Sequence, residues 1–308
     1  MNSKIQTTAT VGLLSILAGL SGSIVPTAVA AETQPVTLRF LAKVGKQPVS
    51  CGATYRLGKP ATHQTLTDFR FYISEVALID ARGKTVPVAL EQDSKWQYQT
   101  VALLDFENKT GACANGTPEL RDRIIGTVPT GTYTGLKFTL GVPASLNHAD
   151  TALAPSPLNL TSLWWNWQSG YKFLRIDLKS ADPMPMMKHH PQKPEAKGAG
   201  QGEAGIAGFP IHLGSTGCHG GSTSEKPMGC SNPNRASVRL TGFNPEKNVV
   251  VLDLAELVSK SPLNHNQPKT SPGCMSDPAD RDCIGIMASL GLPFMGKPAS
   301  PQTIFRIE

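Results

Sequence analysis

Short runs in which hydrophobic and polar residues alternate recur along the whole chain. Gly, Pro, Asn or Asp bound each run, which is typical of strands separated by turns. In a strand with this period of two, successive side chains point to opposite faces. The runs are VTLRFLAKV from Val36, FRFYISEVALI from Phe69, WQYQTVALLDF from Trp96, TYTGLKFTLGV from Thr132, YKFLRIDL from Tyr171, ASVRLTGF from Ala236 and NVVVLDL from Asn248. The pattern predicts an all-β fold, an antiparallel β-sandwich with long loops.

Helical patterns are scarce. TPELRDRIIG, residues 117–126, begins with the Thr and Pro of a typical helix start, and we expect a helix there. LAELVSK from Leu254 and IGIMASL from Ile284 are each long enough for one or two helical turns. The sequence therefore predicts a few short helices.

Two segments do not fit the strand pattern. Residues 1–30 combine an early lysine, the apolar run VGLLSILAGL and a small-x-small site at Ala28-Val29-Ala30, which indicates a secretory signal peptide. Residues 182–205, DPMPMMKHHPQKPEAKGAGQGEAG, are rich in Pro, Gly, Lys and Glu and predict a disordered excursion between two strands. We expect residues 31–308 to form one domain, periplasmic or secreted, without stable membrane insertion.

The cysteines support an oxidising compartment. They are even in number, and no two of them form a CxxC pair, so disulfides are favoured over a zinc site or a thioredoxin-type site. Short loops favour Cys218 with Cys230, Cys274 with Cys283, and Cys51 with Cys113.

Composition and motifs argue against several functional classes. The net charge is +6, but the basic residues are scattered, so nucleic acid is not expected as a partner. The chain has no GxSxG elbow, HExxH, P-loop, EF-hand loop or CxxCH haem site. These features favour a protein that binds rather than one that catalyses.

Three of the four tryptophans lie within residues 164–167. In an extended segment Trp165 and Trp167 share one face and Trp164 faces the other way. After Gly170 the apolar positions are in step with Trp164, which predicts a bend near Ser169-Gly170. The indoles are candidates for core residues, for a stacking platform or for a redox-active site.

Histidines and methionines supply candidate metal ligands. His148 lies in a loop that leads to the tryptophans, and His212 ends a short apolar strand before Cys218 and His219. Imidazole and thioether groups suit copper, especially Cu(I). Weaker candidates are His63, His219, Met184, Met186, Met187, His189 and His190.

Several segments together resemble the MbnP-like proteins, the four-Cys members of the "metallo-mystery pair", which are related to secreted copper proteins of methane oxidisers. The segments are CGATYRLG from Cys51, TDFRFYISEVALID from Thr67, LKFTLGVPASLNHAD from Leu136, SPLNL from Ser156, LWWNWQSGYKFLRIDL from Leu163 and FPIHLGSTGC from Phe209. The linked order of LNH, WxWQxGYKF and HLGSTGC is the specific part of the resemblance. Two cysteines beyond a four-Cys set and the excursion at residues 182–205 depart from the family pattern.

The resemblance implies a function. Members are periplasmic or surface-associated and act with a di-haem, cytochrome c peroxidase-like partner of the MauG/MbnH type, which oxidises a client tryptophan to kynurenine. Carried onto this sequence, His148 and His212 become copper ligands, Trp165 the first choice for the modified residue and Trp167 the second. The protein would serve in copper acquisition or homeostasis and would not itself be an enzyme.

Two other hypotheses stay open. A carbohydrate-binding or adhesion module would use Trp165 and Trp167 as a stacking platform without a metal. A structural scaffold would bury the tryptophans in its core and would contain neither metal nor modified indole.

Overall fold

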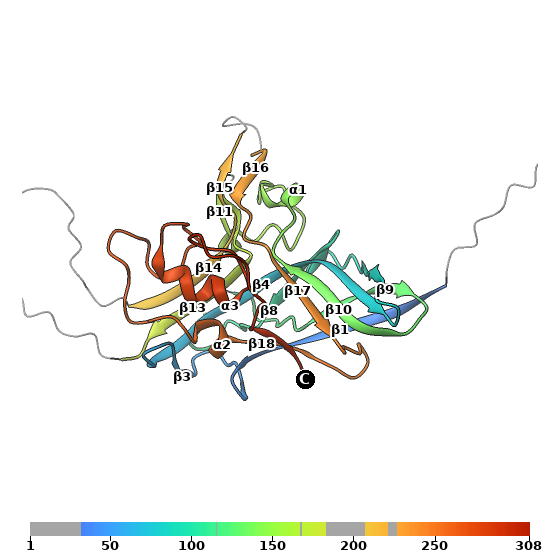
Figure 1. The fold of residues 1–308 in the computed structure, drawn as a ribbon, viewed down its shortest axis with the longest axis horizontal. Coiled ribbons are helices and arrows are strands. Elements are labelled where there is room, and N and C mark those ends of the chain that lie inside the picture. Colours follow the sequence, from blue (N-terminus) through green and yellow to red (C-terminus); the bar gives the residue numbers. More distant parts are fainter. Residues whose placement is uncertain (1–31, 115, 167, 183–206, 221–226) are drawn as a thin grey trace, which may run out of the picture. The chain divides into compact units, whose positions relative to one another are not determined.

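A computed structural model describes residues 32–308 except positions 115, 167, 183–206 and 221–226 (Figure 1). Residues 32–308 form one compact unit. The signal peptide predicted at residues 1–30, Trp167 and nearly all of the excursion lie outside the described residues. The same is true of the candidate ligands Met184, Met186, Met187, His189 and His190.

The first sheet is built around β1 (Thr33–Val44), whose side chains alternate between buried and exposed as its sequence predicts. Its strand order is β19-β18-β1-β9-β6, and β2 also pairs with β1. The other strands are β2 (Gln47–Pro48), β6 (Ala89–Leu90), β9 (Arg123–Pro129), β18 (Val250–Asp253) and β19 (Phe305–Ile307). β18 runs parallel to β1, an exception to the predicted antiparallel pairing.

The second sheet is organised by β4 (Thr62–Asp80), the central strand of the order β14-β13-β4-β10-β17. β3, β5 and β8 also pair with β4 along its length, and β7 pairs with β8. The other strands are β3 (Thr54–Leu57), β5 (Thr85–Pro87), β7 (Gln97–Tyr98), β8 (Val101–Asp105), β10 (Tyr133–Leu140), β13 (Leu174–Ser180), β14 (Gly208–Leu213) and β17 (Ala236–Thr241).

Aromatic side chains pack the two sheets together. Phe40 of β1 contacts Phe138 of β10, with ring centroids 5.9 Å apart, and Phe305 of β19 lies 5.1 Å from Phe138. Phe71 of β4 also contacts Phe305. These contacts join the sheets through one shared hydrophobic cluster, so the predicted β-sandwich is confirmed.

Helices are short, as predicted. They are α1 (Ala144–Asn147), α2 (Leu254–Val258) and α3 (Ile284–Ser289), with 3-10 turns η1 (Thr161–Leu163) and η2 (Arg281–Cys283). Asp253 caps α2 by accepting a hydrogen bond from the Ala255 N–H. In the described part of the chain, no helix is long and apolar enough to cross a membrane.

The helix predicted at residues 117–126 is wrong. The end of this segment belongs to β9, in which Ile124 and Val128 are buried on one face. β9 pairs with β1, with Ile124 opposite Leu38. The helix-like start is overridden because a central strand offers β9 a full set of hydrogen bonds and a buried face.

Two small hairpins complete the fold. β11 (Trp164–Asn166) pairs with β12 (Gly170–Tyr171), and β15 (Thr216–His219) pairs with β16 (Gly229–Asn232). Figure 1 shows β11, β15, β16 and α1 close together at the top of the view. The three disulfides join Cys51 to Cys113, Cys218 to Cys230 and Cys274 to Cys283, as the loop lengths predict.

A row of ionisable side chains crosses four neighbouring strands of the second sheet. Asp105 of β8 lies opposite Arg70 of β4, Arg70 opposite Arg175 of β13, and Arg175 opposite His212 of β14. In the next row Asp68 lies opposite Asp177. We call these six residues the charge ladder.

The central residues of the charge ladder are almost fully buried. Arg70 and Asp68 are each 1% exposed, and the Arg70 Nε donates to Asp68 Oδ1 over 2.8 Å. The Arg175 Nε lies 3.1 Å from Asp68 Oδ2, and its Nη2 lies 2.7 Å from Asp177 Oδ2. Buried charges are tolerated only when paired, so each member depends on its neighbours.

Asp105 is the residue of the ladder whose ionised form is least favourable. Burial raises the pKa of its carboxyl to about 8, and the nearby Glu107 and Asp68 carboxylates act in the same direction. Its Oδ1 accepts a hydrogen bond from the Glu107 N–H, whereas its buried Oδ2 has no partner among the described residues. Asp105 therefore keeps its proton at neutral pH in the folded chain.

Asp105→Asn is expected to raise the free energy of unfolding, by an amount that grows between about pH 4 and pH 8. In this window the unfolded carboxyl has lost its proton and the folded one has kept it, so ionisation favours unfolding of the wild type. Each unit of the pKa elevation corresponds to about 1.4 kcal/mol. Denaturant titrations of both proteins at acidic, neutral and mildly alkaline pH measure the effect. A difference that does not change with pH would contradict a raised pKa.

Candidate metal centre

The tryptophan segment forms a tight hairpin. Asn166 of β11 pairs with Gly170 of β12, and Gly170 has a φ of +74°, a conformation that favours glycine. The Asn166 side-chain oxygen accepts a hydrogen bond from the Ser169 N–H over 2.8 Å, which closes the turn. The bend predicted near Ser169-Gly170 is confirmed.

The two described tryptophans of the hairpin have different surroundings. Trp164 packs against the hydrophobic core, as do Leu174 and Ile176, which the sequence places in step with it. Trp165 is half-buried, and its six-membered ring lies against the backbone of Gly214. A Cβ at Gly214 would lie 2.4 Å from Cζ3 of Trp165, so only glycine allows this approach.

Asn147 joins the hairpin to the histidine loop. It is 1% exposed and ends α1, next to His148. Its Oδ1 accepts a hydrogen bond from the Tyr171 N–H over 3.0 Å, so its Nδ2 is the group that faces Ser215 Oγ at 3.4 Å. Sequence reasoning missed Asn147, although it stands in the LNH motif beside a candidate ligand.

His148 lies against a disulfide. It is 6% exposed, and its Nε2 lies 3.6 Å from the Sγ of Cys230 and 3.3 Å from Asn147 Nδ2. Among the described residues, His148, Cys218 and Cys230 form a group whose candidate ligand atoms all lie within 4.8 Å of one another. His212 and Asp177 are not members of this group.

His212 is held by the charge ladder. It is 8% exposed, and its Nε2 lies 2.6 Å from Asp177 Oδ1. Burial alone would raise the pKa of Asp177, but the hydrogen bond and charge of His212 and the charge of Arg175 lower it to about 2. Because Nε2 faces a carboxylate, Nδ1 is the ring nitrogen left for a metal, the arrangement found in carboxylate–histidine–metal sites.

One short segment connects the two histidines. His212 begins it, Gly214 contacts the Trp165 ring, and Ser215 contacts Asn147, the neighbour of His148. The Trp165 ring therefore lies against the short segment that begins at His212 and contacts the neighbour of His148. That both imidazoles bind one ion stays a prediction.

The weaker histidine candidates lie in exposed positions. The His63 Nδ1 pairs with Asp182 Oδ1 at 2.7 Å, where the chain enters the excursion. A ring nitrogen of His219 lies 3.0 Å from the carbonyl oxygen of Gly229. Neither belongs to a group of three or more ligand atoms in the described residues.

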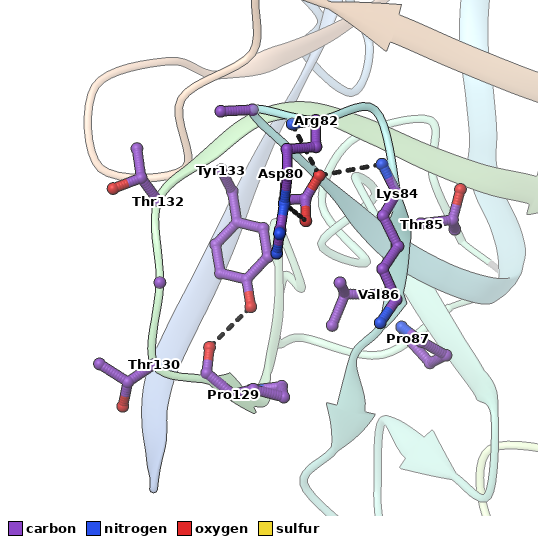
Figure 2. A pocket seen from close by; sticks show the side chains of 12 residues that line it. Asp80, Arg82, Lys84, Thr85, Val86, Pro87, Pro129, Thr130, Thr132 and Tyr133 are labelled. Carbon is purple, nitrogen blue, oxygen red and sulfur yellow. Dashed lines mark hydrogen bonds and ion pairs between the residues drawn. The ribbon is translucent and has the colours of Figure 1, made fainter. Parts of the chain in front are cut away.

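Two cavities have different linings. Figure 2 shows one of about 460 Å³ in which the Asp80 carboxylate accepts from the Arg82 and Lys84 N–H groups and Tyr133 donates to the Pro129 carbonyl. These polar groups close the surrounding turns. Asp80 is the one carboxylate in this lining, so the cavity has no cluster of metal ligands. A second cavity, of about 290 Å³, is lined by His148, Asn147, Cys230 and Met228 among others. The second cavity gives the His148 site an opening to solvent.

A protein-family model for MbnP matches residues 33–276. The chain belongs to the MbnP family. Among solved structures, MbnP from Methylosinus trichosporium is similar with a TM-score of 0.73 and 31% sequence identity, over 90% of this chain and 98% of that chain. A comparison with curated proteins finds no match. The family resemblance expected from the motifs is confirmed.

Gly214→Ala is expected to push the Trp165 ring out of place and to change the tryptophan fluorescence spectrum, because the added methyl would overlap the indole. Gly131→Ala is the matched control, since a Cβ at Gly131 would meet only ordinary contacts at 3.8 Å or more. In a Trp165→Phe background the spectral effect of Gly214→Ala should disappear. A Gly214→Ala spectrum identical to that of the wild type would contradict the packing.

Proposed function

We propose that this protein is a periplasmic or secreted copper-binding protein of the MbnP family that acts in copper acquisition or homeostasis. Copper is bound by His148 and His212, and Trp165 is oxidised to kynurenine by a di-haem partner of the MauG/MbnH type. The observation that carries the proposal is the packing of the Trp165 ring on Gly214, two residues after His212 and next to Ser215, which contacts the neighbour of His148. The protein is the substrate of the oxidation and not its catalyst.

The donor set suits copper. Both imidazoles are mostly buried, so their orientations are restricted before a metal binds. Imidazole binds copper well, and the region lacks the cluster of carboxylates that calcium or magnesium would require among the described residues. Asp177 supports His212 as an outer partner and also fixes the orientation of its ring.

The surroundings of Trp165 support its oxidation at a distance. Its ring is half-buried at the surface of the fold rather than in the core cluster. A docked haem oxidant can draw electrons from the indole without admitting it to a substrate pocket. Conversion to kynurenine opens the five-membered ring and releases its C2 as formate, with peroxide as the terminal oxidant. The product carries an aromatic amine and a ketone, which add polar groups beside the histidines.

Peptide mass spectrometry tests the modification. Protein from the native periplasm, produced with and without the di-haem partner, is digested, and the peptide that contains Trp165 and Trp167 is sequenced. We expect a gain of about 4 Da on Trp165 only when the partner is present. Trp165→Phe should abolish the gain, whereas Trp164→Phe should retain it. A peptide that stays unmodified beside an active partner would refute the proposal, and a gain on Trp167 would correct the residue.

Asp177→Asn is expected to weaken copper binding by about ten-fold to a hundred-fold, because the carboxylate that orients His212 is lost. Competition with a chromophoric chelator measures the affinity. Asp182→Asn is the matched control, since Asp182 pairs with the exposed His63.

A His212→Ala background separates positioning from general damage to the fold. In that background Asp177→Asn should have no further effect on copper affinity. An equal loss of affinity with and without His212 would show that Asp177 acts through fold stability instead.

The carbohydrate hypothesis predicts a different outcome of the same measurements. It requires exposed indoles with polar neighbours, whereas the Trp165 ring is half-buried against Gly214 and Asn166 is used to close the hairpin turn. Unmodified indole, no bound copper and retention on immobilised glycans would favour it.

A further inference from the structure

The three disulfides differ in their access to solvent. Cys274 and Cys283 are 1% and 0% exposed, and Cys113 is 0% exposed. Cys218 and Cys230, in contrast, are both partly exposed. A thiol that reduces disulfides must reach a sulfur atom, so the Cys218–Cys230 bridge is the one open to exchange from either side.

The same bridge is the disulfide that lies against a candidate metal ligand. The Asn147 oxygen is used by the Tyr171 N–H, so the Asn147 Nδ2 donates toward His148 Nε2. Nε2 therefore accepts this hydrogen bond with its lone pair, and it also lies 3.6 Å from Cys230 Sγ. A metal ion at Nε2 would replace the hydrogen bond from Asn147.

We propose that Cys218 and Cys230, once their disulfide is reduced, form a Cu(I) site with the Nε2 of His148. The proposal shares His148 with the function proposed above, but it rests on neither His212 nor the oxidation of Trp165. The disulfide then controls this second site, which lacks its two thiolate ligands when oxidised and gains them when reduced.

The opening step is thiol–disulfide exchange with a dithiol. One thiolate of the reductant attacks a sulfur of the bridge and gives a mixed disulfide and one free cysteine thiolate. The second thiol of the reductant displaces the other cysteine. Two electrons and two protons pass to the protein, and the reductant leaves as its own disulfide. Cu(I) then displaces the thiol protons and undergoes no change of oxidation state.

The geometry suits a three-coordinate soft ion. The three ligand atoms already lie within 4.8 Å of one another. Metal–ligand distances of roughly 2.0 Å to nitrogen and 2.3 Å to sulfur in a trigonal arrangement need ligand separations of roughly 4 Å. Cys218 and Cys230 lie directly opposite each other on β15 and β16, so side-chain rotation can provide this separation while the hairpin stays paired.

The surroundings favour copper over zinc. Thiolates and imidazole in a low-coordinate site select Cu(I), whereas structural zinc takes four ligands. No carboxylate joins this group in the described part of the chain. The Met228 thioether lines the same cavity and is 89% exposed, which gives an arriving Cu(I) a soft donor at the opening.

The first measurement maps reduction on the mature wild-type chain. Graded dithiol is applied, free thiols are alkylated, and the labelled cysteines are identified by mass spectrometry. We expect Cys218 and Cys230 to be labelled before any other pair. Earlier labelling of Cys274 and Cys283 would overturn the proposal.

The second measurement compares Cu(I) binding by oxidised and selectively reduced protein after the dithiol is removed without oxygen. In a His212→Ala background, which lacks the His148–His212 site, reduction should add one Cu(I) per chain, with thiolate-to-Cu(I) absorption and two sulfur neighbours by X-ray absorption. His148→Ala should lower the Cu(I) affinity of this added site by at least ten-fold. Loss of a residue that merely hydrogen-bonds to a ligand already lowers metal affinity by about ten-fold or more, and loss of the ligand itself should cost at least as much.

The controls separate this site from the His148–His212 site. Alkylation of Cys218 and Cys230 in the reduced wild type should remove the added Cu(I) without any substitution that endangers folding. Equal Cu(I) binding by oxidised and reduced His212→Ala protein would overturn the proposal. Failure of the His148–His212 site alone appears as loss of copper from the oxidised protein and leaves the added site intact.

Discussion

The buried ion pairs of the charge ladder are the constraint on which the site depends. Arg70 and Asp68 are almost fully removed from water, and removing one partner of such a pair costs about 3–5 kcal/mol. A shift of one residue between β4 and β13 would separate the pairs, so the ladder fixes the register. It also reaches beyond the sheet, because Arg70 donates to the Ser162 hydroxyl and Arg175 to the Ser162 carbonyl, immediately before the tryptophan hairpin. One network therefore positions both His212 and the segment that presents Trp165.

A second anchor comes from Asn147. Its side chain holds Tyr171 of the hairpin and faces Ser215, while its backbone carries His148. The two histidines thus have unlike supports. His212 is backed by a carboxylate, which fixes the orientation of its ring, and His148 is backed by an amide and a disulfide. In the proposed copper centre, His212 would supply nitrogen coordination, and the His148 side would gain thiolate ligands on reduction.

Most of the fold could be predicted from local pattern, and the failures have physical causes. Alternating runs such as VTLRFLAKV became strands because a period of two buries one complete face. The helix predicted at residues 117–126 was wrong because the signal for a helix start comes from a few local residues. The strand that forms there instead, β9, is stabilised by pairing with β1, which is far away in sequence. The parallel pairing of β1 with β18 was equally hidden, since no local signal reports a partner more than 200 residues away.

The sequence by itself determined the family, the strand content and the candidate histidines and tryptophans, because motifs and alternation are local properties. It favoured one disulfide pairing, which the structure then confirmed. Tertiary structure alone decided what surrounds each candidate. Asp177 pairs with His212 across two neighbouring strands, and the absence of a side chain at Gly214 lets the Trp165 ring pack there. Cys230, on a separate hairpin, contacts His148. Contacts of this kind depend on strand register and on loops crossing in space. Their energies come from burial and pairing, which no short stretch of chain encodes.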